Sequence, residues 1–517
     1  MSFQSDLGNQ DGFAKNEWIF DKLKDESVES LLDRAGGWGP LQFKSFFFVM
    51  CAFQGINIYI YNLAYFELLP SLLCTTDGTQ YHIWGSQTDQ YLYEDTKYAH
   101  QAEMCVDGNL ISEHNWKVDY SVRRSLHNWM TELNLYCVPR FYIGLFGSMY
   151  FLGVALQGLV LNFSDRYGRI MLIRVLAWIQ VVLTLLLYFV QDYRYYYALY
   201  CLLGLSAAKH MCLYMYVNEI STQKHKMLMN SFAKMADSSF VMIISSLYFI
   251  LGGKNWRHLA IFAPILWIIW VILTFFVFES PKYLHAKGKY KELAAYINES
   301  ARQNGKNFKI EESLSLVSKS SVEKSDEVIL KTQHHQAEYS IWNDLKQLRT
   351  LFNFIITVLI FSFVVFNYFM MGLYMKYAVG DIFVNTLFTS LSEVVAYLSA
   401  TVLFEFVGLR LSFIVFSSMS ILFGIPLNFD IPVWIATGCL ILTRFGAQAA
   451  FPSMHYLSNS GLFNPLFVPF LYGVGNLVAK IFTMFAPQIV ELPRPIPMVT
   501  FLATSFGILV CSLLIKM

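Results

Sequence analysis

The chain has 517 residues, of which 55% are hydrophobic and only 15% are charged, and its formal net charge is +1. A soluble protein rarely combines so little charge with so much apolar surface, so the composition argues against a soluble enzyme and indicates a polytopic membrane protein. A net charge this close to zero gives no reason to expect a nucleic-acid partner.

We expect about twelve membrane-spanning helices, because the apolar residues gather in runs of roughly 20, the length that crosses a bilayer. Six runs precede residue 279: Phe43–Leu69, Phe141–Leu161, Ile170–Val190, Tyr195–Val217, Leu228–Leu251 and Leu259–Phe278. Six more follow residue 350: Leu351–Met375, Phe383–Phe404, Leu411–Leu427, Val433–Leu457, Leu466–Val490 and Ile496–Ile515. The predicted fold class is an all-α membrane protein with two six-helix bundles, a plan that recurs in transporters.

Polar segments flank and separate the two bundles. The expected order is a polar leader (1–42), an N-terminal bundle (43–278), a polar central linker (279–350) and a C-terminal bundle (351–517). A long extramembrane loop (70–138) interrupts the first bundle. The leader has neither the apolar core of a secretory signal nor the acid-poor character of a mitochondrial presequence, so we expect the first span to direct insertion.

Three cysteines, Cys74, Cys105 and Cys137, lie in or beside the long loop. An odd number allows at most one disulfide and a remaining thiol, and the pairing stays open. The sequence contains no zinc-ligand spacing, no nucleophile with a base and no phosphate-binding glycine loop. We therefore expect neither an enzyme nor a bound metal or cofactor.

A tight charged turn, Asn162–Arg169, joins the second and third predicted spans. Asp165, Arg166 and Arg169 are too polar for hydrocarbon and are expected at the membrane surface, and Gly168 permits the backbone to turn. The order Asp-Arg-x-Gly-Arg resembles the loop after the second helix of major facilitator superfamily transporters. In that family the loop latches the two halves of the N-terminal bundle on the cytoplasmic side.

More specifically, the chain resembles the organic cation/anion transporters, a solute carrier 22-like branch of that superfamily. The long first loop carries the resemblance together with Leu133-Asn-Leu-Tyr-Cys137, Glu279-Ser-Pro-Lys-Tyr-Leu284 and Gly446-Ala-Gln-Ala-Ala450. The resemblance implies the twelve-helix major facilitator fold and secondary transport of small organic ions by alternating access. It also implies a location in the plasma membrane.

Several positions depart from the pattern of that branch. Tyr200 stands where an arginine usually precedes Gly204 in the fourth helix, and the second charged turn, Glu405–Arg410, has lost its central base. The segment Gly461–Pro465 lacks the usual acid, and the long loop has no glycosylation acceptor. These losses support an alternative function, a non-transporting fold that serves as a structural subunit of a larger membrane complex. The mitochondrial inner membrane is the alternative location.

Two charged residues inside predicted spans are the main substrate-binding candidates. Lys480 stands at the eleventh-helix position where anion-preferring relatives carry arginine and cation-preferring ones carry aspartate. A buried ammonium there would attract an organic carboxylate or sulfate, and the alternative role is an ion pair with Glu393. Glu393 corresponds to an acid of cation-type relatives and is expected to pair with Lys480 or to bind a proton. We favour organic anions, although the two signs leave the charge preference open.

Other polar and aromatic residues inside the spans complete the candidate site. Lys209 and His210 interrupt the fourth span, Lys234 and Asp237 lie three residues apart and are expected to neutralise each other, and Arg444 needs a partner that the sequence does not name. Aromatic side chains suit flat organic ions, and the aromatic candidates are Tyr368, Tyr374 and Tyr397.

The predicted gate is a charge network at the inward membrane face. Asp165, Arg166, Gly168, Arg169, Glu219, Glu279 and Arg410 are its candidate members. Such ion pairs hold one face closed and break as two bundles rock. We expect both chain ends on that side, although the basic residues of the short loops are divided almost evenly between the two faces. The expected partners are an organic-ion substrate and the lipid bilayer, with partner subunits under the alternative function.

Overall fold

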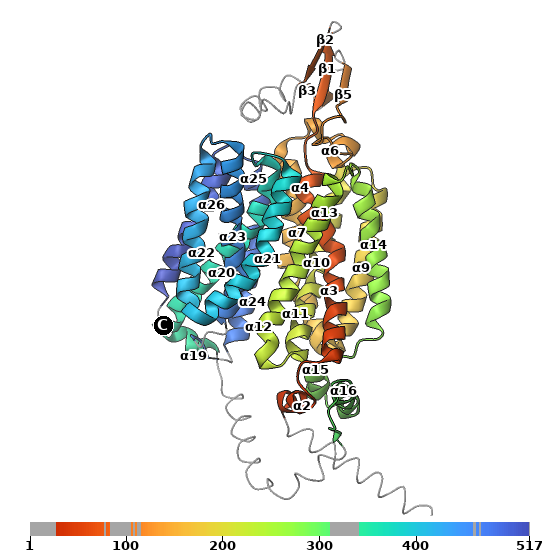
Figure 1. The fold of residues 1–517 in the computed structure, drawn as a ribbon, viewed down its shortest axis with the longest axis vertical. Helices are drawn as coiled ribbons and strands as arrows, with labels where there is room; N and C mark the ends of the chain where they lie inside the picture. The colour runs from red at the N-terminus through yellow and green to blue at the C-terminus, as the bar shows by residue number, and fades with distance from the viewer. Residues whose placement is uncertain are drawn as a thin grey trace, which may run out of the picture.

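The computed structural model describes residues 27–76, 79–82, 105–106, 109–110, 115–310, 341–458, 462–464 and 467–515. Long helices run side by side through the body of the molecule (Figure 1). Small β-strands protrude from one end, and short helices cover the other. We call these the loop end and the linker end, because they carry parts of segments 70–138 and 279–350.

The first six spans are built from straight and broken helices. They are α3 (Pro40–Tyr61), α7 (Arg140–Ala155) with α8 (Gly158–Tyr167), α9 (Arg169–Phe189), α10 (Tyr193–Ser206) with α11 (Ala208–Ile220), α12 (Gln223–Lys234) with η2 (Met235–Ser239) and α13 (Phe240–Ile250), and α14 (Trp256–Thr274). The helix is the favoured element here because it pairs its own backbone polar groups in a medium without water.

The last six spans occupy the opposite side of the molecule, drawn in teal to dark blue in Figure 1. They are α20 (Leu348–Tyr374) with η3 (Met375–Tyr377), α21 (Ile382–Val407), α22 (Leu409–Gly424) with η4 (Ile425–Asn428), α23 (Val433–Ser458), α24 (Val468–Thr483) with α25 (Ala486–Val490), and α26 (Ile496–Leu514).

The predicted all-α membrane fold is confirmed. Within the described part of the chain, 10 spans are long and apolar enough to cross a membrane, and the pair α7 and α8, bent by 41°, makes 11. The helix α3, 22 residues long with Lys44 as its one charged residue, packs along α14 where the sequence predicts the first span. The predicted domain bounds stay a prediction.

Glycine allows the closest helix packing in the first six spans, between α7 and α10. A Cβ atom on Gly153 would lie 2.0 Å from the carbonyl oxygen of Cys201, and one on Gly204 would lie 2.0 Å from the carbonyl oxygen of Tyr150. Side chains of any size are therefore excluded at this crossing, as is common where membrane helices touch.

The long loop forms small antiparallel sheets that the sequence did not predict. The strand β1 (Leu72–Thr76) lies between β2 (Thr79–His82) and β5 (Asn115–Val118), and β3 (Cys105–Val106) pairs with β4 (Asn109–Leu110). Cys137, in the 3-10 turn η1 (Leu135–Cys137), is disulfide-bonded, as the sequence allowed. The side chains of Cys74 and Cys105 lie outside the described residues, so their pairing stays open.

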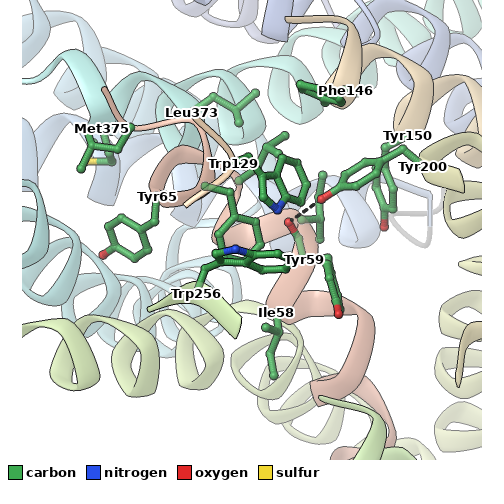
Figure 2. Packing of buried hydrophobic residues seen from close by; sticks show 14 of the residues in the cluster. Ile58, Tyr59, Tyr65, Trp129, Phe146, Tyr150, Tyr200, Trp256, Leu373 and Met375 are labelled. Carbon is green, nitrogen blue, oxygen red and sulfur yellow. Dashed lines mark hydrogen bonds between the residues drawn. The ribbon is translucent and has the colours of Figure 1, made fainter. Parts of the chain in front are cut away.

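The end of the loop returns into the first six spans. Trp129 begins α6 (Trp129–Glu132) and is completely buried. Its ring lies 5.1 Å from Phe66, 5.4 Å from Phe146, 5.5 Å from Tyr200 and 5.8 Å from Trp256, centroid to centroid. We call these residues the Trp129 cluster, and Figure 2 shows Trp129 near Trp256, Phe146 and Tyr200 from close by.

Tyr200, which replaces the expected fourth-helix arginine, belongs to the Trp129 cluster. Its hydroxyl donates a hydrogen bond to the carbonyl oxygen of Tyr59, 3.3 Å away, drawn as the dashed line in Figure 2. The departure from the family pattern therefore exchanges a charge for an aromatic side chain with a satisfied hydroxyl.

At the linker end, three short helices form a separate small core. They are α2 (Val28–Arg34), α15 (Pro281–Ala286) and α16 (Tyr290–Gln303), and α19 (Ile341–Lys346) precedes α20. Gln42 at the start of α3 donates to Ser300 of α16 at 2.6 Å, and Lys282 of α15 pairs with Glu29 of α2 at 2.6 Å. Parts of the predicted leader and linker thus pack together beneath the first six spans.

Candidate functional site

The charged turn at the linker end forms a network around Arg169. Its guanidinium lies 2.8 Å from Asp165 and contacts both carboxylate oxygens of Glu219, at 3.1 and 3.3 Å. The two-point contact with Glu219 fixes the plane of the guanidinium. This part of the predicted network is present, and it ties the start of α9 to the end of α11.

Glu279 joins the same network through the backbone rather than through a cation. Its carboxylate accepts hydrogen bonds from the amides of Arg169 and Ile170, the first residues of α9, at 3.1 to 3.2 Å. A negative group at a helix N-terminus is favourable because the unpaired amides there carry partial positive charge. Burial raises the pKa of Glu279, and the amide hydrogen bonds oppose the rise.

Gly168 is required by this geometry for two reasons. Its φ is 108°, a region that side chains rarely adopt. A Cβ atom there would also lie 2.5 Å from an oxygen of Glu279.

Two predicted members lie outside the network. Arg166 is exposed, and its guanidinium lies 5.4 Å from the ring of Tyr167. Arg410 donates to the carbonyl oxygen of Leu513 at 2.6 Å, near the end of α26. The described contacts of the Arg169 network all join residues of the first six spans and Glu279, which follows them.

A second network, which the sequence did not predict, lies at the loop end. The ammonium of Lys376 lies 2.6 Å from the carboxylate of Glu67 and is also hydrogen-bonded to Glu491, which accepts from the Tyr377 hydroxyl at 2.7 Å. Lys376, Glu67 and Glu491 are all at most 5% exposed. Glu67 follows the first span, whereas Lys376 and Glu491 belong to the last six, so this loop-end triad connects the two sets of spans.

Further contacts near the triad also cross between the two sets of spans. Ser148 of α7 donates to the carbonyl oxygen of Met484 at 2.8 Å, and Arg123 pairs with Asp381 at 3.0 Å. No periodicity or short spacing could have indicated the triad, because its members are 309 and 115 residues apart.

Glu393, in the middle of α21, is completely buried and surrounded by neutral donors. Its Oε1 accepts from the hydroxyls of Ser238, Tyr397 and Tyr368, the last at 3.0 Å, and its Oε2 accepts from the amide of Gln448 at 2.8 Å. Hydrogen bonds of this kind stabilise a carboxylate without a cation. Two predicted aromatic residues, Tyr368 and Tyr397, are therefore held by Glu393.

Asp237, in the π-helical segment η2 of the first six spans, is a second buried acid. Its carboxylate lies 3.2 Å from the ammonium of Lys234 and accepts from Tyr214 at 3.1 Å and Asn57 at 2.9 Å. His210 lies 4.0 Å away. The structure thus contains the expected ion pair between Lys234 and Asp237.

Lys480 and Lys209 contact aromatic rings. The Lys480 ammonium lies 4.9 Å from the centre of the Phe369 ring, and the Lys209 ammonium lies 4.7 Å from that of Trp267. Both lysines are buried, and neither has an ion pair among the described residues. The alternative role for Lys480, a pair with Glu393, is not formed.

A small cavity lies between the two sets of spans. Tyr61 and Phe151 line it from one side, and Tyr368, Phe369 and Arg444 line it from the other. Its volume of about 20 Å³ holds roughly one water-sized group. An organic ion therefore needs the helices to separate. Tyr374, the remaining aromatic candidate, is buried in the core at the loop end.

Comparison with known proteins adds family information to this geometry. Residues 124–462 match the Major Facilitator Superfamily. The chain is 24% identical to organic cation/carnitine transporter 2 of Homo sapiens over 398 residues, which cover 76% of this chain and 67% of that protein. It is 22% identical to solute carrier family 22 member 4 of Mus musculus over 401 residues, which cover 76% and 68%.

Solved structures are similar in fold. The partially occluded inward-open form of the xylose transporter XylE from E. coli superposes with a TM-score of 0.59, covering 92% of this chain and 98% of that one at 11% identity. Its inward-open form gives a TM-score of 0.58 at 10% identity. At such low identity the likeness concerns the arrangement of helices alone.

Proposed function

Because this chain belongs to the major facilitator superfamily, we propose that it is a secondary transporter that moves small organic ions and prefers organic anions. The observation that supports the anion preference is an excess of buried positive charge in the region that lies between the Arg169 network and the loop-end triad. In the described spans this region holds three buried basic side chains, Lys209, Arg444 and Lys480, and the partly buried Lys234, against two buried acidic ones, Asp237 and Glu393.

The imbalance matters because charge inside a membrane is stable only when it is paired or hydrated. Asp237 is matched by Lys234, and Glu393 is matched by neutral donors. Lys480 has an aromatic contact and no acid within ion-pair distance among the described residues. A carboxylate or sulfate on the substrate supplies the missing counter-ion, and the rings of Phe369, Tyr368 and Tyr61 supply flat contact surface.

The placement of the two end networks supports alternating access. The loop-end triad joins the first six spans to the last six, so its ion pairs must break if that end is to open. The Arg169 network lies within the first six spans and moves with them. Rocking of one bundle against the other then exposes the central residues to each face in turn. We place the loop end outside and the chain in the plasma membrane.

An organic cation is the competing substrate class. Two observations favour it: the names of the relatives, which include organic cation/carnitine transporters, and the buried carboxylate of Glu393. In this case Glu393 would be the substrate's counter-ion, and Lys480 would be released from any direct role.

Uptake into proteoliposomes separates these two classes. The probes are a labelled aromatic monocarboxylate and labelled tetraethylammonium, tested with the wild type and with Lys480→Met, Lys480→Arg and Glu393→Gln. We expect carboxylate uptake that falls in Lys480→Met and is retained in Lys480→Arg, which keeps the positive charge. Uptake of tetraethylammonium alone, abolished by Glu393→Gln, would replace the anion assignment with the cation one.

A structural subunit without transport is the remaining function to exclude, because Tyr200 and the altered second charged turn depart from the family pattern. It predicts that purification in mild detergent recovers a stoichiometric set of partner subunits. It also predicts no uptake of either probe. Both results together would refute the transporter proposal.

A further inference from the structure

Arg444 is a buried cation that contributes to the excess of positive charge but to which the proposed transport cycle assigns no contact with the substrate. It lies on α23, is 2% exposed, and lines the cavity between the two sets of spans. Its one described polar contact is from a terminal nitrogen to the sulfur of Met242 at 3.5 Å, a weak acceptor. The other two guanidinium nitrogens, Nε and Nη1, have no hydrogen-bond partner among the described residues.

The acids of the structure are already engaged elsewhere. Glu393, on α21, contacts α23 through Gln448, which lies one helical turn from Arg444 and donates to the Glu393 carboxylate at 2.8 Å. Its oxygens accept from Ser238, Tyr397, Tyr368 and Gln448. Asp381, beyond Arg444 toward the loop end, pairs with Arg123 at 3.0 Å. Arg444 is therefore a buried cation without an acidic side chain to pair with among the described residues, and we expect its counter-ion to be a bound ion.

The size of the cavity limits what that counter-ion can be. A volume of about 20 Å³ accommodates a single small group and excludes a carboxylate that brings an organic body with it. The surrounding side chains, among them Ile60, Phe151, Phe369 and Leu373, are apolar. A monatomic anion fits this space and can accept from Nη2 of Arg444, which lies nearest to Gly372 in the cavity wall. The Coulomb attraction of the guanidinium offsets the loss of hydration between apolar walls.

We propose that the cavity beside Arg444 binds one chloride ion while the loop end is closed. The ion accepts from Nη2, the guanidinium nitrogen nearest to Gly372 in the cavity wall, and neutralises a charge in the seam between the two sets of spans. The proposal concerns an inorganic ion at Arg444, whereas the transport proposal concerns an organic ion at Lys480; Phe369 borders both places.

Two glycines offer a matched test that leaves Arg444 in place. A Cβ atom on Gly372, which lines the cavity, would meet only the Arg444 guanidinium, at 3.9 Å, so Gly372→Ala is sterically allowed and places a methyl group in the cavity. A Cβ atom on Gly473, on α24, would meet nothing within 4 Å. Both substitutions favour the helix equally, so Gly473→Ala controls for helix propensity.

The experiment measures the melting temperature of the purified protein while chloride replaces gluconate at constant ionic strength. Ligand binding to the folded state raises the melting temperature in a saturable way. We expect this rise in the wild type and in Gly473→Ala, and we expect it to be lost in Gly372→Ala and in Arg444→Met. Direct binding of radioactive chloride should weaken by about tenfold or more in Arg444→Met, as the loss of charged hydrogen bonds predicts.

Either of two results would overturn the proposal. One is a wild-type melting temperature that does not depend on chloride, which would mean that water, and not chloride, occupies the cavity beside Arg444. The other is a chloride effect in Gly372→Ala equal to that of the wild type, which would place the ion elsewhere. If Arg444→Met does not fold, the two glycine variants still decide the question. No outcome bears on uptake, so failure here leaves the transport proposal to its own test.

Discussion

The ammonium of Lys376 lies 2.6 Å from the carboxylate of Glu67, a residue 309 positions earlier in the chain. This buried pair, shared with Glu491, connects the end of the first span to the ends of the seventh and eleventh. Two carboxylates and one ammonium leave the loop-end triad with one negative charge in excess when all three are ionised. The stability of the triad and its dependence on pH both follow from this excess negative charge.

Removing the cation should open the loop end. Lys376→Met leaves Glu67 and Glu491 buried and facing each other, and breaking a buried ion pair in this way costs roughly 3–5 kcal/mol. We expect a lower melting temperature and faster maleimide labelling of a cysteine introduced as Ser148→Cys, which lies at the same crossing. Arg410→Met, whose guanidinium caps α26 at the other end, is the control. Unchanged labelling in Lys376→Met would show that the triad does not close this end.

Protonation of the triad should stabilise the closed loop end near neutral pH. Burial raises the pKa of Glu67 to about 7, against the attraction of Lys376 and with the help of Glu491, from an ordinary value of 4.5. A carboxyl whose pKa is higher in the closed form binds a proton on closing. Closure is therefore favoured increasingly as pH falls through about 7, and the gain levels off below the ordinary value.

Glu67→Gln tests the direction in which closure of the loop end depends on pH. It carries the neutral form permanently and leaves Lys376 and Glu491 as a balanced pair. Labelling rates are divided by those of an exposed model thiol at the same pH, because acidification lowers the thiolate fraction of every cysteine. We expect this corrected rate for Ser148→Cys to fall between pH 8 and pH 6 with Glu67 present and to stay constant in Glu67→Gln. Labelling that accelerates on acidification would contradict the assignment.

The Arg169 network should contribute to stability of the first six spans. Arg169→Met removes charged hydrogen bonds to Asp165 and Glu219, and one such bond is worth roughly 1.5–3 kcal/mol. Arg166→Met, at an exposed neighbour without a described ion pair, is the matched control. We expect the melting temperature to fall in the first variant and to stay constant in the second. An equal change of melting temperature in the two variants would show that the network does not contribute to stability.

The crossing of α7 and α10 should not tolerate a methyl group. Gly153→Ala and Gly204→Ala each place a Cβ atom 2.0 Å from a carbonyl oxygen of the other helix, and forced overpacking costs roughly 1–3 kcal/mol or more. Gly158→Ala introduces the same change on α8, where nothing lies within 4 Å. Thermal unfolding of the three variants is the measurement, and only Gly158→Ala should resemble the wild type.

Glu393→Gln separates the charge of this residue from its hydrogen bonds. The glutamine retains one oxygen for Tyr368, Tyr397 and Ser238, and its amide can donate to the otherwise unpaired oxygen of Gln448 after that side chain flips. We expect nearly unchanged stability together with altered transport or altered dependence of transport on pH. A large loss of stability would show that the carboxylate is needed for packing alone.

The features that sequence analysis predicted correctly are local ones. Apolar runs indicate spans because membrane length is a property of each segment, and Lys234 and Asp237 meet because three residues make nearly one helical turn. The Arg169 network could be predicted from the sequence because Glu219 and Glu279 lie at the linker ends of spans that surround the charged turn. The break between α10 and α11 and the one between α3 and α4 (Leu63–Phe66) left no signal in the apolar pattern.

The features that were missed depend on helix rotation and on packing across the chain. Lys376 and Glu491 were predicted near span ends, but nothing in the sequence pairs them with Glu67. Lys480 and Glu393 have opposite charges on predicted neighbouring helices, yet Glu393 is satisfied by hydroxyl and amide donors and Lys480 contacts Phe369. The opposite charges of Lys480 and Glu393 therefore did not predict an ion pair between them, since neutral donors compete for a buried carboxylate.

The position of Trp129 has a consequence for biosynthesis. Its indole ring packs against Trp256, so a nascent chain cannot complete this part of the structure until the sixth span has left the ribosome. Until then, the segment that carries Trp129 must wait with an uncovered aromatic ring beside helices that are still being inserted. Chaperones or the insertion machinery have a defined interval in which to hold it, and chains truncated before residue 256 should be degraded rapidly in cells.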